Sequence, residues 1–140
     1  MPIQFHTEEP LNFELEQSAN ITQWLQNVIK EEKHFLAYLN YIFCTDDYLL
    51  NINRQYLQHD YYTDVITFDN SDQGPQIEGD IFISIHRIQE NATSLSVDTQ
   101  QELQRVMVHG LLHLLGYKDK SEAEQKIMRQ KEDHYLATFC

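Results

Sequence analysis

The apolar positions of this chain recur with helical spacing in some stretches and fill others almost continuously. In residues 19–33 they recur every three or four positions, which predicts an amphipathic helix with Ser18 as its cap. Residues 35–44 are a dense run of aromatic and aliphatic side chains. Such a run predicts a strand, with a buried helix as the alternative that periodicity alone leaves open. Residues 3–5 begin a further short strand.

Turn-forming and capping residues divide the middle of the chain. Thr45–Asp47 is typical of a helix start and predicts a helix over about 48–57. Two apolar segments rich in β-branched residues follow, at 63–68 and 77–85. The residues between them, 69–76, include Asn, Ser, Asp, Gly and Pro, which predicts a surface loop. The two segments are therefore expected to pair as the strands of a hairpin.

Three helices are predicted in the last third of the chain. Residues 85–92 form a short connecting helix, and Thr99–Glu102 and Ser121–Glu124 each have the pattern of a capping box at a helix start. The last helix is expected to carry the apolar side chains Ala123, Ile127, Met128 and Tyr135. With 140 residues and 41% hydrophobic content, residues 1–140 are expected to form one α+β domain, a small mixed sheet of about four strands with about five helices.

The composition narrows the cellular context. The apolar stretches are far shorter than the roughly 18 residues of a membrane span, and the first residues lack the basic start and apolar run of a signal peptide. Two cysteines, Cys44 and Cys140, are too few for a disulfide framework and are expected to be free thiols. These features predict a cytoplasmic protein without a membrane partner.

Two histidines stand four residues apart in the apolar run 106–115. On a helix, positions i and i+4 share one face, so the imidazoles of His109 and His113 can reach the same cation. Gly116 suits the left-handed residue that ends a helix, and after the turn Asp119 is the first oxygen donor able to complete a three-ligand site. Paired histidines also occur as hydrogen-bonded structural residues. Here the nearly continuous apolar surroundings make an unpaired imidazole costly and favour a metal at the C-terminal end of a central buried helix.

Other features of the same region bear on the kind of site. A glycine inside a helix costs about 1 kcal/mol relative to alanine, so Gly110 predicts a close-packed neighbour. A zincin peptidase would carry its general base, Glu, at that position, which argues against a peptidase. His134 on the last helix is the substitute third donor if Asp119 does not ligate. Four acidic residues in and around the 69–76 loop are interpreted as a solvated surface: Asp69, Asp72, Glu78 and Asp80. The alternative is a second metal site formed by their carboxylates.

The sequence around the two histidines resembles the YbeY-type metal-dependent endoribonucleases, whose signature runs His-Gly-x-Leu-His-Leu-x-Gly-Tyr-Asp-His. The coinciding residues are His109, Gly110, Leu112, His113, Leu114, Gly116 and Tyr117. Upstream, 63–68 is similar to the family's Thr-Asp-Val-Leu-Ser-Phe strand, and 79–84 to its Gly-Asp-Ile-x-Ile-Ser strand. Order and spacing agree, so the resemblance covers most of the chain from about Asp47 onward and implies the family's small mixed sheet with helices.

The metal-binding segment departs from the family pattern. Lys118 stands where the family has Asp, and Asp119 stands where it has the third ligand His. We therefore expect His109, His113 and Asp119 to be the metal ligands and the catalytic residues. A divalent ion held there would keep a water, lower its pKa and polarise a phosphoryl oxygen. Zinc is expected first. Exchanging an imidazole for a carboxylate makes the water less acidic and brings in nickel or manganese as alternatives.

A second departure concerns phosphate binding. Counting back from Thr63, the family's arginine falls on Leu57, while Asn53 matches the asparagine before it. The resemblance implies that this arginine binds or stabilises phosphate. The candidate phosphate contacts in its place are Lys118, Lys120 and Arg54.

The resemblance implies a single-strand-specific endoribonuclease that matures ribosomal RNA, including the 3′ end of the small-subunit RNA, and acts in ribosome quality control. The formal net charge of −12 argues against tight binding to naked RNA. Either the metal supplies the charge that catalysis needs, or another macromolecule, the ribosomal small subunit or a basic ribosomal protein, brings enzyme and RNA together. The alternative is a non-catalytic ribosome-assembly factor, in which the altered ligand and missing arginine accompany a structural or absent metal. Neither hypothesis involves DNA.

Overall fold

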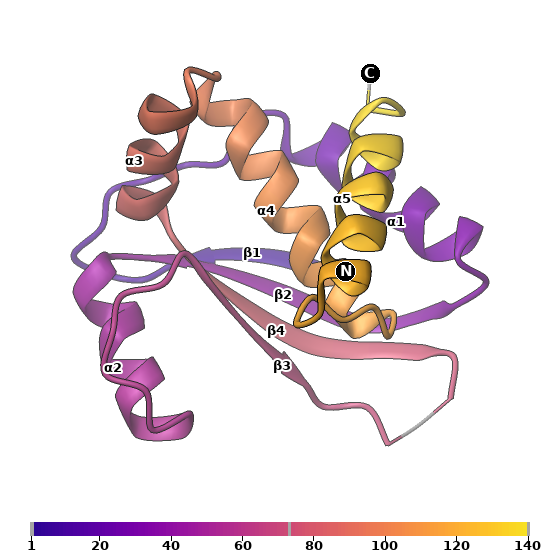
Figure 1. The fold of residues 1–140 in the computed structure, drawn as a ribbon, viewed down its shortest axis with the longest axis horizontal. Coiled ribbons are helices and arrows are strands. Elements are labelled where there is room, and N and C mark those ends of the chain that lie inside the picture. Colours follow the sequence, from indigo (N-terminus) through magenta and orange to yellow (C-terminus); the bar gives the residue numbers. More distant parts are fainter. Residues whose placement is uncertain (1, 73, 140) are drawn as a thin grey trace.

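The computed structural model describes residues 2–72 and 74–139, which form a four-stranded mixed sheet and five helices (Figure 1). The strands are β1 (Ile3–Thr7), β2 (Phe35–Cys44), β3 (Val65–Asp69) and β4 (Gln76–Ser84). The helices are α1 (Ser18–Glu31), α2 (Asp46–Tyr56), α3 (Ile85–Leu95), α4 (Thr99–Leu114) and α5 (Glu122–Leu136). The predicted α+β class is confirmed, and residues 35–44 are a strand.

The strand order is β1-β2-β4-β3, with β1, β2 and β4 parallel and β3 antiparallel to β4. The predicted hairpin is confirmed, with Val65 opposite Ile83 and Asp69 opposite Gly79. β2 lies between β1 and β4, and its residues 41–44 are buried, whereas Phe35 at its start is 67% exposed. The apolar character of 41–44 follows, since a strand flanked on both sides and covered by helices has little contact with water.

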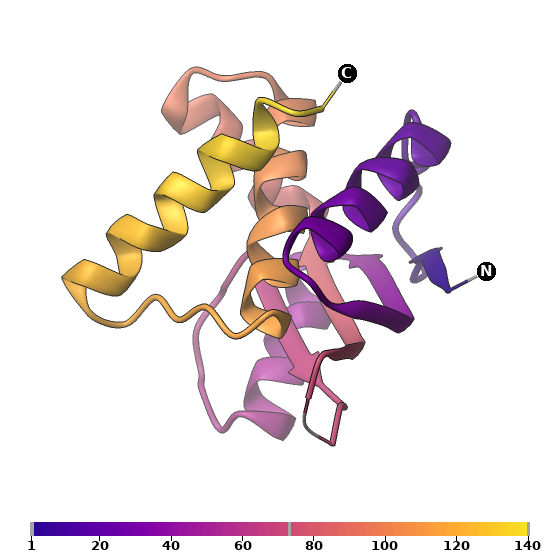
Figure 2. The same cartoon turned by 90° about the vertical axis from the view of Figure 1, so that its right-hand side faces the viewer.

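Side chains alternate across the sheet, so each strand serves two layers. Ile81 on β4 belongs to the main core, whereas its neighbour Phe82 packs in a smaller core with Leu49 and Ile52 of α2. Figures 1 and 2 show α1, α3, α4 and α5 on one side of the sheet and α2 on the other. α4 is the central helix of the larger layer, and Tyr41 from β2 donates a hydrogen bond to the Met107 carbonyl within it, at 2.8 Å.

Two predicted helix caps are wrong. Ser18 is the first residue of α1 rather than its cap, because Gln17 before it adopts a left-handed conformation with φ 56° and occupies the cap position. Thr99 is likewise the first residue of α4, and Asp98 stands at its N-cap, so the predicted capping box does not form there. In both cases the chain enters the helix one residue earlier than the side-chain pattern suggested.

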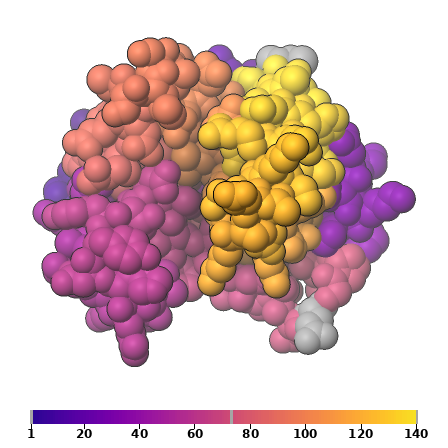
Figure 3. Space-filling view, viewed as in Figure 1, coloured from indigo at the N-terminus to yellow at the C-terminus, as the bar shows by residue number. Residues whose placement is uncertain are grey.

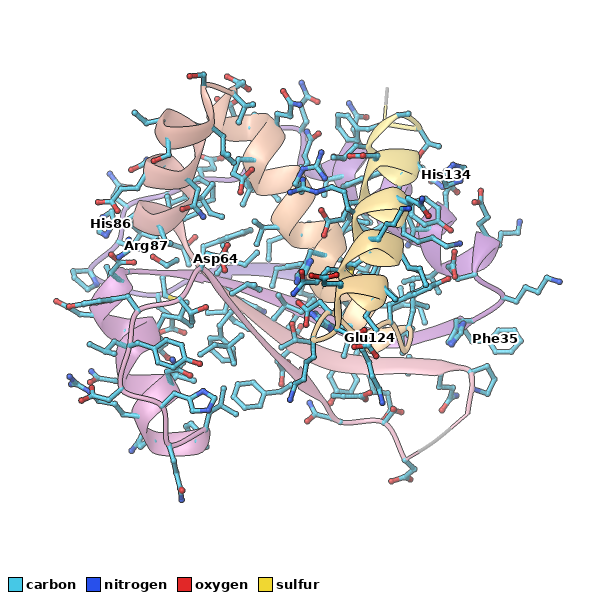
Figure 4. The ribbon with its side chains drawn as sticks, viewed as in Figure 1. Phe35, Asp64, His86, Arg87, Glu124 and His134 are labelled. Carbon is cyan, nitrogen blue, oxygen red and sulfur yellow. The ribbon has the colours of Figure 1, made fainter. Side chains whose placement is uncertain are left out.

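The predicted start of α5 is confirmed, but its packing face differs. Ser121–Glu124 forms a capping box, with Glu124 at the beginning of the helix in Figure 4. Met128 and Tyr135 are buried as expected, whereas Ala123 and Ile127 are exposed. The two exposed positions lie about 100° or more around the helix from Met128, so they face water when Met128 faces the core.

Two further expectations concern the cellular context. Within residues 2–72 and 74–139, every helix is too short or too polar to cross a membrane. Cys44 is a buried free thiol, and burial, with a smaller effect of Glu8 and Asp46, raises the pKa of that thiol to about 12. Cys140 lies outside the described residues.

Candidate metal centre

The two histidines of α4 and the acidic residue after it converge on one point. His109 Nε2 and His113 Nε2 lie 3.1 Å apart. Asp119 Oδ2 lies 3.3 Å from His109 Nε2 and 3.2 Å from His113 Nε2. In the part of the chain that the structure describes, these are the three metal-ligating side chains close enough to share an ion.

The dimensions of this triangle fit a small divalent ion. Zinc binds imidazole nitrogen and carboxylate oxygen at about 2.0–2.1 Å, and a tetrahedron of that size has edges of about 3.3–3.4 Å. The observed separations of 3.1–3.3 Å are close to those edges. Two imidazoles and one carboxylate suit zinc and its first-row neighbours better than calcium, which takes six to eight oxygens. Three donors also leave one corner of the tetrahedron open.

The end of α4 determines where Asp119 lies. Gly116 has φ 106°, and its amide donates to the His113 carbonyl at 3.0 Å while the Tyr117 amide donates to the Leu112 carbonyl at 3.0 Å. This is the Schellman arrangement, which requires a left-handed residue after the helix and turns the chain back. The turn places Asp119 beside the two histidines. The predicted role of Gly116 is therefore confirmed.

Tyr117 holds the same turn in place through both its backbone and its side chain. Its carbonyl accepts from His113 Nδ1 at 3.0 Å, which fixes the orientation of that imidazole. Its hydroxyl donates to Glu32 at the end of α1 at 2.7 Å, and Glu32 also accepts from Lys131 and Tyr135 of α5. The turn that carries Asp119 is thus tied to two helices.

Glu132 of α5 plays the corresponding part for His109. Its Oε2 lies 2.6 Å from His109 Nδ1, and its Oε1 accepts from Arg105 Nη1 at 2.8 Å. Glu132 is 6% exposed. A buried carboxylate behind a ligating imidazole orients the ring and raises its basicity. We missed this residue in the sequence, although its position four residues after Met128 places it on the buried face of α5.

The charges of this pair reinforce one another. Burial raises the pKa of the Glu132 carboxyl, but the hydrogen bonds from His109 and Arg105 outweigh burial and hold that pKa below its usual value. Burial lowers the pKa of His109, but the bond and charge of Glu132, with the charge of Asp119, outweigh it and raise that pKa above its usual value. Binding of a metal ion at His109 would therefore compete with protonation of this imidazole.

The triangle opens into a cavity of about 630 Å³. Residues of β3 line it, and so does Asp64 just before that strand, labelled in Figure 4. Burial raises the pKa of the Asp64 carboxyl, which accepts from Asn91. On the α4 side the cavity is lined by the two histidines with Asp119 and Lys120, and on the α2 side by the loop 57–63. Figure 3 shows this hollow between the magenta surface of α2 and the gold surface of α5.

A comparison with known proteins decides the family. The family model described as Endoribonuclease YbeY matches residues 3–140. The chain belongs to this family. A curated family member from Cytophaga hutchinsonii is 53% identical over 133 residues, covering 95% of this chain and 93% of the relative. One from Flavobacterium psychrophilum is 50% identical over 129 residues, covering 92% and 91%. The resemblance inferred from the motifs is confirmed.

The fold comparison agrees with the sequence comparison. A solution structure of a protein from Thermotoga maritima superposes with a TM-score of 0.67 at 27% identity, covering 96% of this chain and 86% of the other. The arrangement of sheet and helices is therefore shared with a solved structure over nearly the whole chain.

The three candidate phosphate contacts, all of them described residues, lie in different places relative to the cavity, and Lys120 is the one that lines it. Lys118 is exposed. Its charge adds, after the hydrogen bond from the Ser121 backbone, to the lowering of the Glu124 pKa. Arg54 is paired with Asp60 on the surface and, among the described residues, stands outside the cavity lining. Leu57, the position at which the resemblance places the family's arginine, does line the cavity and is 41% exposed.

Residues of the two alternative metal sites, His134 and the acids Asp69 and Asp80 of the β3–β4 hairpin, make hydrogen bonds or ion pairs with other side chains. His134 pairs with Glu31 at 2.8 Å on the side of α5 that faces α1, so the structure puts the substitute third donor away from the triangle (Figure 4). Asp69 accepts from the backbone and side chain of Ser71. Asp80 accepts from Asn40 and Asn70. These loop and strand acids act in local hydrogen bonds.

Proposed function

We propose that this protein is a metal-dependent endoribonuclease specific for single-stranded RNA, with its ion held by His109, His113 and Asp119. The observation that carries the proposal is the triangle of three donor atoms 3.1–3.3 Å apart at the edge of an open cavity. Membership of a family described as endoribonucleases supports RNA as the substrate.

The protein's own residues prepare the site before substrate arrives. Glu132 and the Tyr117 carbonyl hold the two imidazoles through their Nδ1 atoms, so both Nε2 atoms face the same point. When bound, a divalent ion supplies Lewis acidity toward a phosphodiester oxygen and acidifies water for hydrolysis. The donor set favours zinc, with nickel and manganese as alternatives. The cavity positions the RNA strand beside this metal centre.

The charge distribution bears on how RNA is bound. The net charge of −12 opposes a polyanion. Lys120 lines the cavity, and Lys126 and Arg129 line an adjoining hollow of about 560 Å³ that also includes His109 and Asp119. These cations lie next to the metal centre, where they can offset the acidic surface locally. We propose that a basic ribosomal protein of the small subunit supplies the remaining attraction.

On this basis we propose ribosomal RNA as the substrate, including maturation of the small-subunit RNA 3′ end, with a further part in ribosome quality control in the cytoplasm. A second candidate is a non-catalytic assembly factor. The observation that favours it is Leu57, an apolar side chain on the cavity wall where the family pattern has a cation.

One experiment separates the two. The protein is purified without an affinity tag, its metal content is measured by mass spectrometry, and cleavage of matched single-stranded and duplex RNA is followed with and without chelator. We expect stoichiometric metal, cleavage of the single strand, and loss of cleavage on chelation that added zinc restores. His113→Ala should behave like chelated protein, whereas the control His134→Ala should cleave like the parent. Metal-loaded protein without cleavage supports the assembly factor.

A further inference from the structure

The loop after α2 carries an aromatic pair into the cavity of the metal centre. The rings of His59 and Tyr61 have centroids 5.1 Å apart and are inclined by 18°, so they are stacked. The Tyr61 hydroxyl lies 2.9 Å from His59 Nδ1. Both residues line the cavity that also contains His109 and His113. The pair and the metal centre therefore face one shared space.

A buried residue of α2 holds this pair through two hydrogen bonds. Asn53 of α2 is 1% exposed, and its backbone carbonyl accepts from the His59 amide at 3.1 Å. Its side-chain Nδ2 donates to the Tyr61 carbonyl at 2.9 Å. Gln58, which directly precedes His59, has φ 57°, a left-handed conformation that is unfavourable for a residue with a side chain. Such backbone persists where the surroundings impose it, and it gathers at functional sites.

The stacked rings are exposed rather than packed into a core. Tyr61 is 55% exposed, and His59 is exposed as well. A flat aromatic surface open to a cavity is suited to an unpaired nucleobase, because every base has a π-face that stacks on aromatic side chains. Stacking needs no positive charge, so it suits a protein with a net charge of −12.

We propose that His59 and Tyr61 form a stacking platform for an unpaired nucleobase of the RNA strand whose phosphodiester lies at the metal centre. The identity of the ligand rests on the proposed function. A base inside a duplex has both faces covered by its neighbours, so the platform discriminates in favour of single strands. Asn53 is a positioning residue for the platform.

The test measures binding of a labelled single-stranded oligoribonucleotide by fluorescence anisotropy, on zinc-free protein in chelator. Stacking of one base is worth about 1–3 kcal/mol, so His59→Ala and Tyr61→Ala should each weaken binding by roughly fivefold to 150-fold. His59→Phe and Tyr61→Phe keep a stacking ring and should bind like the parent. Tyr62→Ala is the matched control, because this neighbouring tyrosine instead contacts Arg87 and Asp47. Duplex RNA should show no difference among the variants.

A second readout uses an oligonucleotide carrying 2-aminopurine, whose fluorescence falls on stacking. We expect quenching by the parent and by His59→Phe, and little quenching by His59→Ala. In zinc-loaded protein, the alanine variants should raise KM and leave kcat nearly unchanged.

Alanine variants that bind and quench like the parent overturn the platform, and so does an equal loss of binding in His59→Phe and His59→Ala. The proposed function fails separately, if the zinc-loaded parent does not cleave RNA. The binding experiment on zinc-free protein decides the platform in either case.

Discussion

Gly110 lies between the two histidines, where α4 packs tightly against β3 and β4. A Cβ atom at this position would lie 3.0 Å from both Ile81 Cδ1 and Ile81 Cγ2, and 3.3 Å from Thr67 Oγ1. Carbon atoms in contact are separated by about 3.5–4.0 Å, so Ile81 must retreat by roughly half an ångström. The two contacts are to different branches of Ile81, which is 0% exposed, so the side chain has little free space into which it can move. The predicted close packing around Gly110 is confirmed.

The magnitude follows from two opposing effects. Overpacking a filled core costs about 1–3 kcal/mol. Replacing glycine by alanine in a helix returns about 1 kcal/mol. We therefore expect Gly110→Ala to lower the free energy of unfolding by about 0–2 kcal/mol. Gly110→Val adds two methyl groups beyond alanine and has a lower helix propensity than alanine, so its loss should exceed about 3 kcal/mol.

The assay is urea denaturation followed by far-ultraviolet circular dichroism, on zinc-free protein because bound metal would stabilise the folded state by mass action. Ile81→Val removes Cδ1, costs about 0.5–1.5 kcal/mol alone, and should recover about 0.5–1 kcal/mol of the Gly110→Ala loss in the double variant. A Gly110→Ala protein that is more stable by the full propensity gain, with additive behaviour in the double variant, refutes the packing argument.

The remaining predictions concern the metal centre. His113→Ala should release the ion and keep the fold, because two donors hold a divalent ion far less well than three; metal analysis with circular dichroism checks this, and retained stoichiometric metal contradicts the ligand assignment. Asp119→Ala should weaken zinc binding sharply and Asp119→His should preserve or tighten it, as measured by zinc titration; an Asp119→Ala protein with parental affinity would exclude Asp119 as a ligand. Because Glu132 helps raise the pKa of His109, zinc affinity should begin to fall, as pH decreases, at a higher pH than for an ordinary histidine. Glu132→Gln should shift that fall to lower pH and reduce zinc affinity at neutral pH by about 10–100-fold; an unchanged pH midpoint would show that Glu132 does not control the proton on His109.

The sequence by itself determined the parts of this protein that depend on local spacing. Apolar periodicity located α1, helix-start patterns located α2, α4 and α5, and the turn residues at 69–76 located the β3–β4 hairpin. The four-residue spacing of His109 and His113 already implied a shared face, because a helix places i and i+4 together. Gly116 indicated the left-handed turn that brings Asp119 back, for the equally local reason that only glycine adopts that conformation at little cost.

Only the tertiary structure decided the contacts between elements that are far apart in the chain. Glu132 reaches His109 because α5 packs beside α4, and Glu32 reaches Tyr117 because α1 ends beside the same turn. Such pairings have no spacing rule, since they depend on how helices stack on the sheet. The His59–Tyr61 pair reads in the sequence as an ordinary loop. Its place in the metal-site cavity follows from β3, which brings the end of α2 and the end of α4 to the two sides of one space.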